Sequence, residues 1–136
     1  MKVYIFIFYI IISFSKIFAH ESNYKNLSKI EMDVLRNDKI IGYSNYFFKH
    51  DGENMTVENH TKFSVDMFGV KIFSIDSKSK EIYKKGNLTS FVSQTFQNDK
   101  LKFVKLNYDK KKNKFVINGS SYNGEANLNN IIGNWW

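Results

Sequence analysis

Apolar and polar residues alternate along much of the chain beyond residue 29. The clearest case is residues 55–67, in which the apolar residues Met55, Val57, Phe63, Val65 and Met67 share one parity, and charged residues such as Glu58 and Lys62 share the other. Successive side chains of a strand point to opposite faces, whereas a helix would scatter these residues around its circumference. The pattern therefore predicts a strand with one apolar face, and residues 30–34 predict an earlier strand in the same way.

Other segments carry large apolar residues on both parities. Residues 40–48 and 73–75 do so, and we expect both faces of these strands to be partly covered. Residues 104–108 alternate, while Leu101 and Phe103 fall on the opposite parity, which predicts a bulge or burial on both sides. A sheet that curls over itself, or a sandwich, would supply the cover without a helix.

Turn residues recur about every dozen positions between these segments, from Arg36-Asn37-Asp38-Lys39 to Asn123-Gly124. Such spacing is typical of an antiparallel meander. Asp51-Gly52 tolerates the positive φ angles of a type I′ turn and is predicted to join the second and third strands. We expect an all-β fold: a single antiparallel meander forming a curved sheet, a half-barrel or a sandwich. The short stretch 21–29 is the sole helix candidate beyond the N-terminal segment.

The first 19 residues have the organisation of a signal peptide. Lys2 precedes an apolar run from Val3 to Ile12, and Ala19 precedes a polar stretch. A signal anchor is the alternative, but the run is shorter than the roughly 20 residues that a membrane-spanning helix needs. We therefore predict a signal peptide helix over residues 1–19, cleavage after Ala19, and one β domain over residues 20–136.

Composition narrows the classes of function. The chain of 136 residues has no Cys, which excludes disulfides, thiolate metal sites and Cys nucleophiles. Its formal charge of +7 comes almost entirely from lysines, with Arg36 as the one arginine, interleaved with acidic residues and asparagines. This distribution is typical of a solvated surface, so we expect no nucleic-acid partner. The run Lys110 to Lys114 predicts an exposed hairpin tip, with peripheral contact with an anionic membrane as the sharper alternative.

Candidate catalytic groups are few. His50 falls in a predicted turn and His60 on a polar parity, so both are expected to face solvent. Cleavage after Ala19 would make His20 the new N-terminus, whose amine and imidazole suit copper, but no spacing brings a second histidine to it. We expect no metal and no cofactor. Glu81 with Tyr83 is a possible catalytic pair, although carboxylate catalysis would want a second acid facing Glu81.

Three ordered motifs resemble a group of exported bacterial proteins, the DUF6134 family, between Ile30 and about Lys100. They are Val34-x-x-x-x-Lys39-x-Ile41-Gly42, the segment Val57 to Val70, and Glu81-x-Tyr83-x-x-Gly86-x-Leu88-x-Ser90 followed by Thr95-x-x-Asn98. The resemblance implies an antiparallel β protein of the cell envelope, similar to the curved half-barrels of periplasmic lipid carriers, and implies no activity. Members usually continue past a motif like Asn134-Trp135-Trp136, so we expect a shortened member with an unpaired edge and poor solubility.

The excess of apolar residues on both parities favours a binding function. We expect a periplasmic, cell-envelope protein of a Gram-negative bacterium that binds an apolar or amphipathic molecule such as a lipid on the concave face of its sheet. The residues expected to line that face are Tyr43, Phe47, Phe63, Val65 and Phe91. An envelope module that pairs an edge strand with a partner is the first alternative, and an enzyme using Glu81 with Tyr83, or copper at His20, is the second. The pattern leaves the oligomeric state open.

Overall fold

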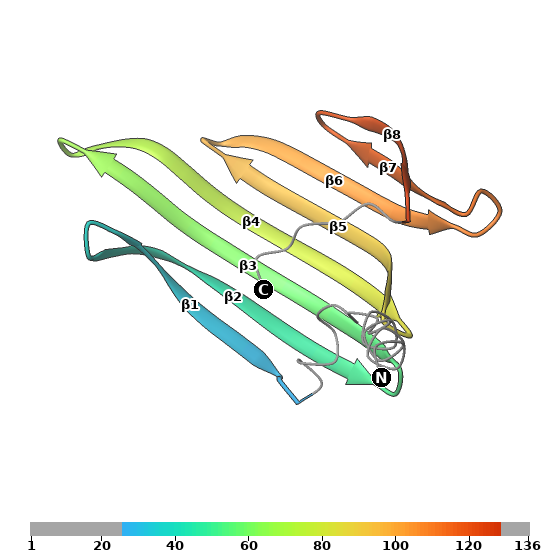
Figure 1. Cartoon of the computed structure of the whole chain (residues 1–136). Coiled ribbons are helices and arrows are strands. Elements are labelled where there is room, and N and C mark those ends of the chain that lie inside the picture. Colours follow the sequence, from blue (N-terminus) through green and yellow to red (C-terminus); the bar gives the residue numbers. More distant parts are fainter. Residues whose placement is uncertain (1–25, 129–136) are drawn as a thin grey trace, which may run out of the picture.

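Residues 26–128 are described by a computed structural model of the chain, and they form eight strands (Figure 1). The bounds are β1 (Lys29–Arg36), β2 (Lys39–Asp51), β3 (Asn54–Met67), β4 (Val70–Lys84), β5 (Asn87–Gln97), β6 (Lys100–Asp109), β7 (Lys114–Gly119) and β8 (Asn123–Asn127).

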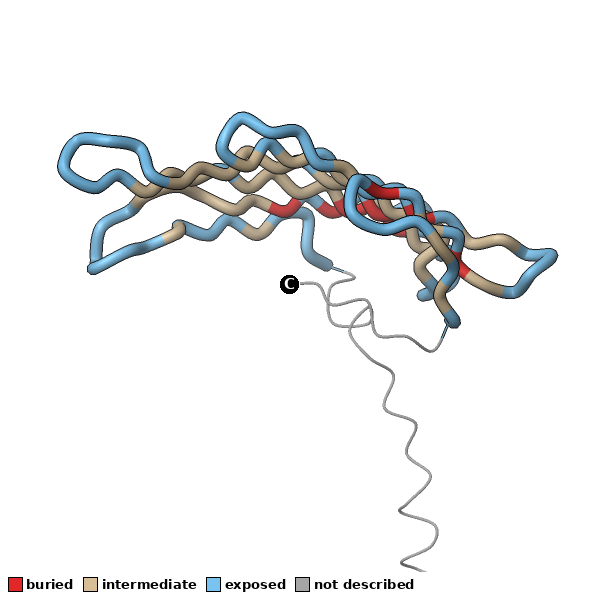
Figure 2. The backbone as a smooth tube through the Cα atoms, turned by 90° about the horizontal axis from the view of Figure 1, so that it is seen from above, coloured by how far each residue is buried: buried red, intermediate tan, exposed pale blue. Residues whose placement is uncertain are grey.

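The eight strands make one sheet in the order of the chain, and each pairs antiparallel with its neighbours in sequence. This confirms the predicted all-β meander. Figure 2 shows that the sheet is a single bent layer, so the curved sheet is the form that the described residues adopt, with no second sheet or helix among them. Within residues 26–128 no helix is long and apolar enough to cross a membrane.

Short turns explain how the sequence reverses direction so often. Four hairpins have two-residue loops in which both residues have positive φ: Asn37-Asp38, Phe68-Gly69, Lys85-Gly86 and Asn98-Asp99. This combination is typical of the type I′ turn, whose twist matches that of the strands. The predicted turn at Asp51-Gly52 joins β2 to β3, but its loop is Gly52-Glu53 and only Gly52 has positive φ. Type I′ is therefore the wrong turn type here, since it needs positive φ at both positions.

The strand pairing is irregular at three places. None of them lies in β6, where the sequence predicted a bulge. The register shifts between Val34 and Leu35, between Val65 and Asp66, and between Ile82 and Tyr83. Strand β6 pairs regularly with both neighbours, so the bulge predicted near Leu101 and Phe103 is wrong. Leu101 and Phe103 point to the face opposite that of Leu106, and of these two Phe103 is half-buried while Leu101 is 54% exposed, so burial on both sides is only partial. Bulges increase local twist and bending, consistent with the bent layer in Figure 2.

The bend gives the sheet a concave face, which is turned toward the viewer in Figure 1, and a convex face behind it. Strand register aligns Phe48, Val57, Glu81, Phe91 and Leu106 in one row on the concave face. The buried apolar side chains belong to this row and the positions beside it: Tyr46, Phe48, Met55, Val57, Leu106 and Phe115. We call these six residues the core. Apolar burial at this place holds the middle strands together.

Candidate functional site

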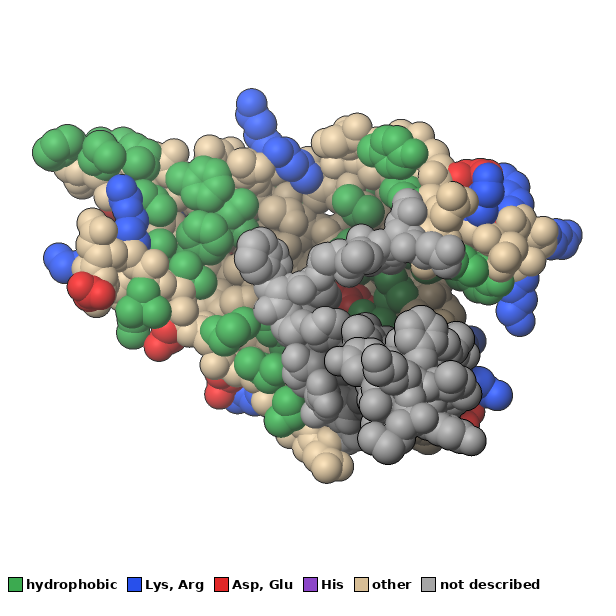
Figure 3. Space-filling view, viewed as in Figure 1, with side chains coloured by type: hydrophobic (Ala, Val, Ile, Leu, Met, Phe, Trp, Pro, Cys, Tyr) green, Lys and Arg blue, Asp and Glu red, His purple; other side chains and the backbone are tan. Residues whose placement is uncertain are grey.

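The two faces of the sheet differ sharply in charge. On β1 to β5, Glu81 is the one charged side chain at a concave position apart from Arg36 and its partner Lys39 at the tip of the β1–β2 hairpin, and Glu81 is buried. The convex positions of the same strands carry many charged residues: Lys29, Glu31, Asp33, Lys49, Glu58, Lys62, Asp76, Lys78 and Lys80. A face rich in ion pairs is typical of contact with water. The concave face therefore has the composition of a contact surface, and Figure 3 shows several groups of apolar side chains on the visible part of this face.

Small polar side chains cross the concave face in two adjacent rows. They are Ser44, Asn59, Thr61, Ser77, Ser79, Ser93 and Thr95, which we call the hydroxyl band. The band lies beside the core, and its two rows are two and four residues away from the row of Val57 and Glu81 along each strand.

Hydrogen bonds link the band across strands. The Ser44 and Thr61 hydroxyl oxygens lie 2.6 Å apart, and Thr61 donates to the Asn59 amide oxygen at 3.1 Å. The hydroxyls of Ser77 and Thr95 lie 2.7 Å apart. When two hydroxyls bond to each other, one O–H donates and the other remains able to donate elsewhere. The Ser77–Thr95 pair can therefore offer an O–H to an acceptor lying on the face.

A second apolar region, which we call the outer patch, lies on the far side of the band from the core. It consists of Val34, Phe63, Val65, Phe73 and Ile75, all half-buried. The rings of Phe63 and Phe73 are 5.9 Å apart, centroid to centroid, at an angle of 40°. Opposite Phe63 stands Gly42, where any Cβ would collide with the Phe63 Cβ and the Lys62 carbonyl oxygen. The patch thus combines apolar surface with partial access from solvent.

The band continues toward β7 into a depression of about 240 Å³. Its lining includes Ser93, Thr95, Lys102, Gly119 and Tyr122. The Lys102 ammonium donates to the Gln97 amide oxygen at 2.6 Å. Apolar side chains, among them Val104 and Ile117, line the same depression, so it offers both apolar surface and hydroxyl groups.

Glu81 and Tyr83 meet inside the apolar end of the concave face. The Tyr83 hydroxyl donates to Glu81 Oε2 at 2.6 Å, and Glu81 is only 3% exposed. Burial raises the pKa of Tyr46, and the nearby Glu81 carboxylate adds to that effect. The residues directly opposite Glu81 are Val57 and Phe91. Neither of these two positions holds the second acid that carboxylate catalysis would want, and the hydrogen bond between Tyr83 and Glu81 lies beside the core.

A polar cluster occupies the convex face around His60. Its Nε2 lies 3.2 Å from Asp76 Oδ1, its Nδ1 lies 3.3 Å from the Tyr43 hydroxyl, and Lys62 Nζ lies 3.0 Å from Asp76 Oδ2. Hydrogen bonds from Lys62 and then from His60 hold the pKa of Asp76 below its ordinary value. The His60, Lys62 and Asp76 side chains are about a third exposed or more. The arrangement is therefore a solvated network of ion pairs.

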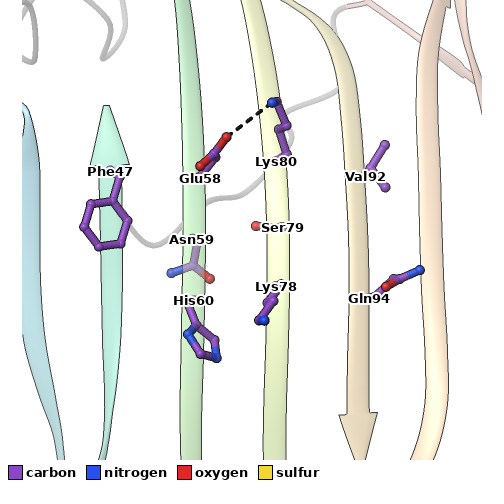
Figure 4. A pocket seen from close by; sticks show the side chains of 9 residues that line it. All are labelled: Phe47, Glu58, Asn59, His60, Lys78, Ser79, Lys80, Val92 and Gln94. Carbon is purple, nitrogen blue, oxygen red and sulfur yellow. Dashed lines mark hydrogen bonds and ion pairs between the residues drawn. The ribbon is translucent and has the colours of Figure 1, made fainter. Parts of the chain in front are cut away.

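Figure 4 shows the neighbouring part of the same face, a shallow depression of about 360 Å³. Phe47 lies at one side of it and Val92 at the other. Between them Lys80 and Glu58 form an ion pair at 3.2 Å. The hollow therefore combines the apolar surface of Phe47 and Val92 with the charged groups of the ion pair and Lys78.

The structure does not bring together the five residues expected to line the concave face. Phe63 and Val65 lie in the outer patch, and Phe91 lies between Glu81 and Leu106 on the same face. Tyr43 and Phe47 lie on the convex face, directly opposite Lys62 and Glu58. Residues 40–48 are apolar on both parities, so the sequence could not show which set faces inward. The hydroxyl band was not predicted from the sequence, although Ser alternates with Asp and Lys in residues 76–80.

The motif residues serve turns and cross-strand contacts. Gly86 has φ of +78° in the β4–β5 turn, and Leu88 stands opposite Tyr83. The Asn98 amide oxygen accepts a hydrogen bond from the Ser74 backbone N–H at 2.8 Å. Their companions in the motifs have been placed above: Gly42, Glu81, Tyr83 and Thr95.

The remaining candidates give no metal centre in the part of the chain that the structure describes. Residues 26–128 contain no group of three or more His, Asp or Glu side chains that could hold a metal ion. His50 bonds the Leu27 carbonyl oxygen at 3.1 Å. His20, the predicted signal peptide and the motif Asn134-Trp135-Trp136 lie outside the described residues.

The lysine-rich tip between β6 and β7 is largely engaged in local contacts. Lys112 and Lys114 pair with Glu125 at 2.6 and 3.4 Å, and the pKa of Glu125 is lowered by Lys112 and then by Lys114. The Asp109 carboxylate accepts hydrogen bonds from the backbone N–H groups of Lys111 and Lys112. These contacts fit a solvated hairpin tip.

Comparison with known proteins identifies the family. A family model described as a domain of unknown function, DUF6134, matches residues 32–136. The match includes all the motif residues above and extends beyond Lys100 to the last residue. Among the curated proteins and among the solved structures nothing matches. Because the match covers most of the chain, the protein belongs to the DUF6134 family.

Proposed function

We propose that this protein binds an amphipathic lipid on the concave face of its sheet, in the cell envelope. The observation that carries the proposal is the charge asymmetry between the two faces. Water accounts for the charged convex face. Contact with something less polar accounts for a concave face that carries few charges and is partly apolar in a single-layer sheet.

The hydroxyl band and the outer patch together define the part of the face that a ligand would occupy. Core residues such as Val57 are 1% exposed and belong to the folded interior. Phe63 and Val65 retain partial access, as do Ser77 and Thr95 in the neighbouring band. An acyl chain on the patch and a polar group on the band would bury apolar surface while keeping the polar group hydrogen-bonded.

The chemistry of the band favours an uncharged polar group. Hydroxyls and one amide can both donate and accept, which suits hydroxyl and ester groups. On β2 to β4 a charged headgroup buried in the band would lack a compensating partner, because the acidic and basic side chains at their concave positions are Glu81 beside the core, His50, and Lys39 at the β1–β2 tip. The Lys102 ammonium of β6, opposite Thr95, already donates to Gln97. We therefore infer a monoacylglycerol-like or glycolipid-like ligand. Location in the periplasm is supported by the signal-peptide pattern of residues 1–19.

Native mass spectrometry of the full chain, titrated with 1-monooleoylglycerol and separately with oleate, tests the proposal. We expect an adduct with the glyceride and weaker retention of the free acid. The substitutions Thr61→Val and Thr95→Val preserve side-chain shape and remove one hydroxyl each. Loss of one net hydrogen bond weakens binding by roughly 2- to 10-fold, so each variant should show a loss of that size.

Thr56→Val is the matched control, because Thr56 lies on the convex face opposite Lys49 and Ile82. It should bind the glyceride as the unaltered chain does. Absence of any glyceride adduct would refute lipid binding. An adduct that all three variants retain equally would refute the assignment to the hydroxyl band.

A further inference from the structure

One end of the sheet gathers the most exposed apolar side chains. Seven large apolar or aromatic side chains among residues 26–128 are at least half exposed. Six of them sit in or beside the β1–β2, β3–β4 and β5–β6 turns: Leu35, Ile40, Phe68, Val70, Phe96 and Leu101. The seventh, Tyr122, follows β7. We call these three hairpin turns with their six side chains the apolar tips.

Topology places the apolar tips together. In an antiparallel meander, alternate turns lie at the same end of the sheet, and Figure 1 shows the three turns side by side there. The opposite end carries the β2–β3, β4–β5 and β6–β7 turns, with Gly52-Glu53, Lys85-Gly86 and residues 110–113. No large apolar side chain in those three turns is exposed. The difference between the ends is therefore a property of this chain and not of hairpin turns in general.

Phe68 shows that the apolar tips do not serve the fold. It is 99% exposed and has φ of +52° at the first position of its turn. Left-handed backbone is disfavoured for a bulky residue, and the corresponding positions of two other type I′ turns hold Asn37 and Asn98. An aromatic ring here gains no intramolecular burial and occupies an unfavourable backbone conformation. Strain retained at an exposed position is a reason to look for a function.

Cations accompany the apolar side chains at this end. Arg36 and Lys39 flank the first turn, Lys71 follows the second, and Lys100 and Lys102 follow the third. Three acidic residues share these positions, Asp38, Asp66 and Asp99, so the end has a net positive charge. Apolar tips combined with nearby Lys and Arg are the features that segments lying in an anionic membrane interface share.

We propose that the apolar tips insert into the headgroup region of an anionic lipid bilayer, with the sheet standing on this end. The three turns lie apart from one another at this end of the sheet and form three small apolar projections. Separate projections of this kind can insert between the lipids of a fluid bilayer. The long stems of Lys39, Lys71 and Lys100 can lie along the apolar layer while their ammonium groups reach the phosphates. The proposal rests on exposure and charge at one end and is independent of ligand binding on the concave face.

The absence of cysteine makes a position-specific test possible. Phe68→Cys, labelled with an environment-sensitive NBD fluorophore in the full chain, is mixed with phosphatidylglycerol–phosphatidylethanolamine vesicles and with phosphatidylcholine vesicles. Lys110→Cys, labelled in the same way, is the matched control at the opposite end. We expect a blue shift and increased emission for the label at residue 68 with the anionic vesicles, and little change for the label at residue 110. Because the readout is local, attachment through the apolar N-terminal run would not imitate it.

A second measurement addresses affinity. Vesicle sedimentation of the unlabelled chain is compared with the double variant Ile40→Thr, Phe68→Asn, whose residues suit a strand and a type I′ turn. The variant should bind the anionic vesicles at least about tenfold more weakly, since two apolar insertions are lost. An unshifted label at residue 68, a shift at residue 110 alone, or equal sedimentation of the two chains would each overturn the proposal.

Discussion

Replacing Phe68 by Asn should stabilise the protein, although it removes an aromatic side chain. Phe68 is 99% exposed, so its loss forfeits almost no buried apolar surface. Its φ of +52° lies in the left-handed region, which costs an ordinary residue about 1 kcal/mol or more and which Asn tolerates. The expected gain is therefore about 1 kcal/mol, equivalent to roughly 4–8 °C in Tm for a domain of about 100 residues.

Urea unfolding followed by circular dichroism measures this change. We expect a higher midpoint with an unchanged m value, because the surface exposed on unfolding hardly changes. The reverse substitution Asn37→Phe, at the equivalent position of the β1–β2 turn with φ of +50°, should cost about the same amount. A loss of stability in Phe68→Asn would refute the reasoning, since it would mean that the ring makes a stabilising contact within the folded chain.

Three further outcomes follow from the packing and the ion pairs. Gly42→Ala should destabilise the fold by about 1–3 kcal/mol in urea, because the new Cβ would collide with Phe63 across β2 and β3; an unchanged midpoint would contradict this packing. Tyr83→Phe removes the hydrogen bond to buried Glu81 and should cost roughly 1.5–3 kcal/mol, and a cost below about 0.5 kcal/mol would show that this bond is unimportant. The pKa of Asp76 is lowered by a neighbouring lysine, so its ion pairing stabilises the fold above the unfolded pKa of about 3.9 and is lost as the pH falls through the lower, folded pKa. Between pH 5 and pH 2, unaltered protein should therefore lose more stability than Asp76→Asn, and parallel pH profiles would exclude this contribution.

Much of the fold followed from local features of the sequence. Alternation in residues 30–34 and 55–67 predicted β1 and β3, and the spacing of turn residues predicted the meander. These inferences succeeded because side-chain parity and turn conformation depend on a few neighbouring residues. The type of the β2–β3 turn was wrong because the loop begins one residue later than the Asp51-Gly52 pair indicated.

The candidate site could be predicted only in part. Phe63, Val65 and Phe91 do lie on the concave face, while Tyr43 and Phe47 lie on the convex one. Where both parities are apolar, no local rule states which parity faces inward, because the assignment depends on cross-strand register and on the direction in which the sheet bends.

The sequence by itself determined the elements of this protein: strands, turns, the absence of cysteine chemistry and the list of polar and apolar residues. Only the tertiary structure decided which residues act together. Pairing of β2 to β5 assembled the hydroxyl band from four separate segments, and the even number of reversals between them brought Leu35, Phe68 and Leu101 to one end. Both the hydroxyl band and the apolar tips consist of residues that are far apart in the chain. Strand register makes them neighbours, and register depends on the pairing of several strands and cannot be read from any single segment.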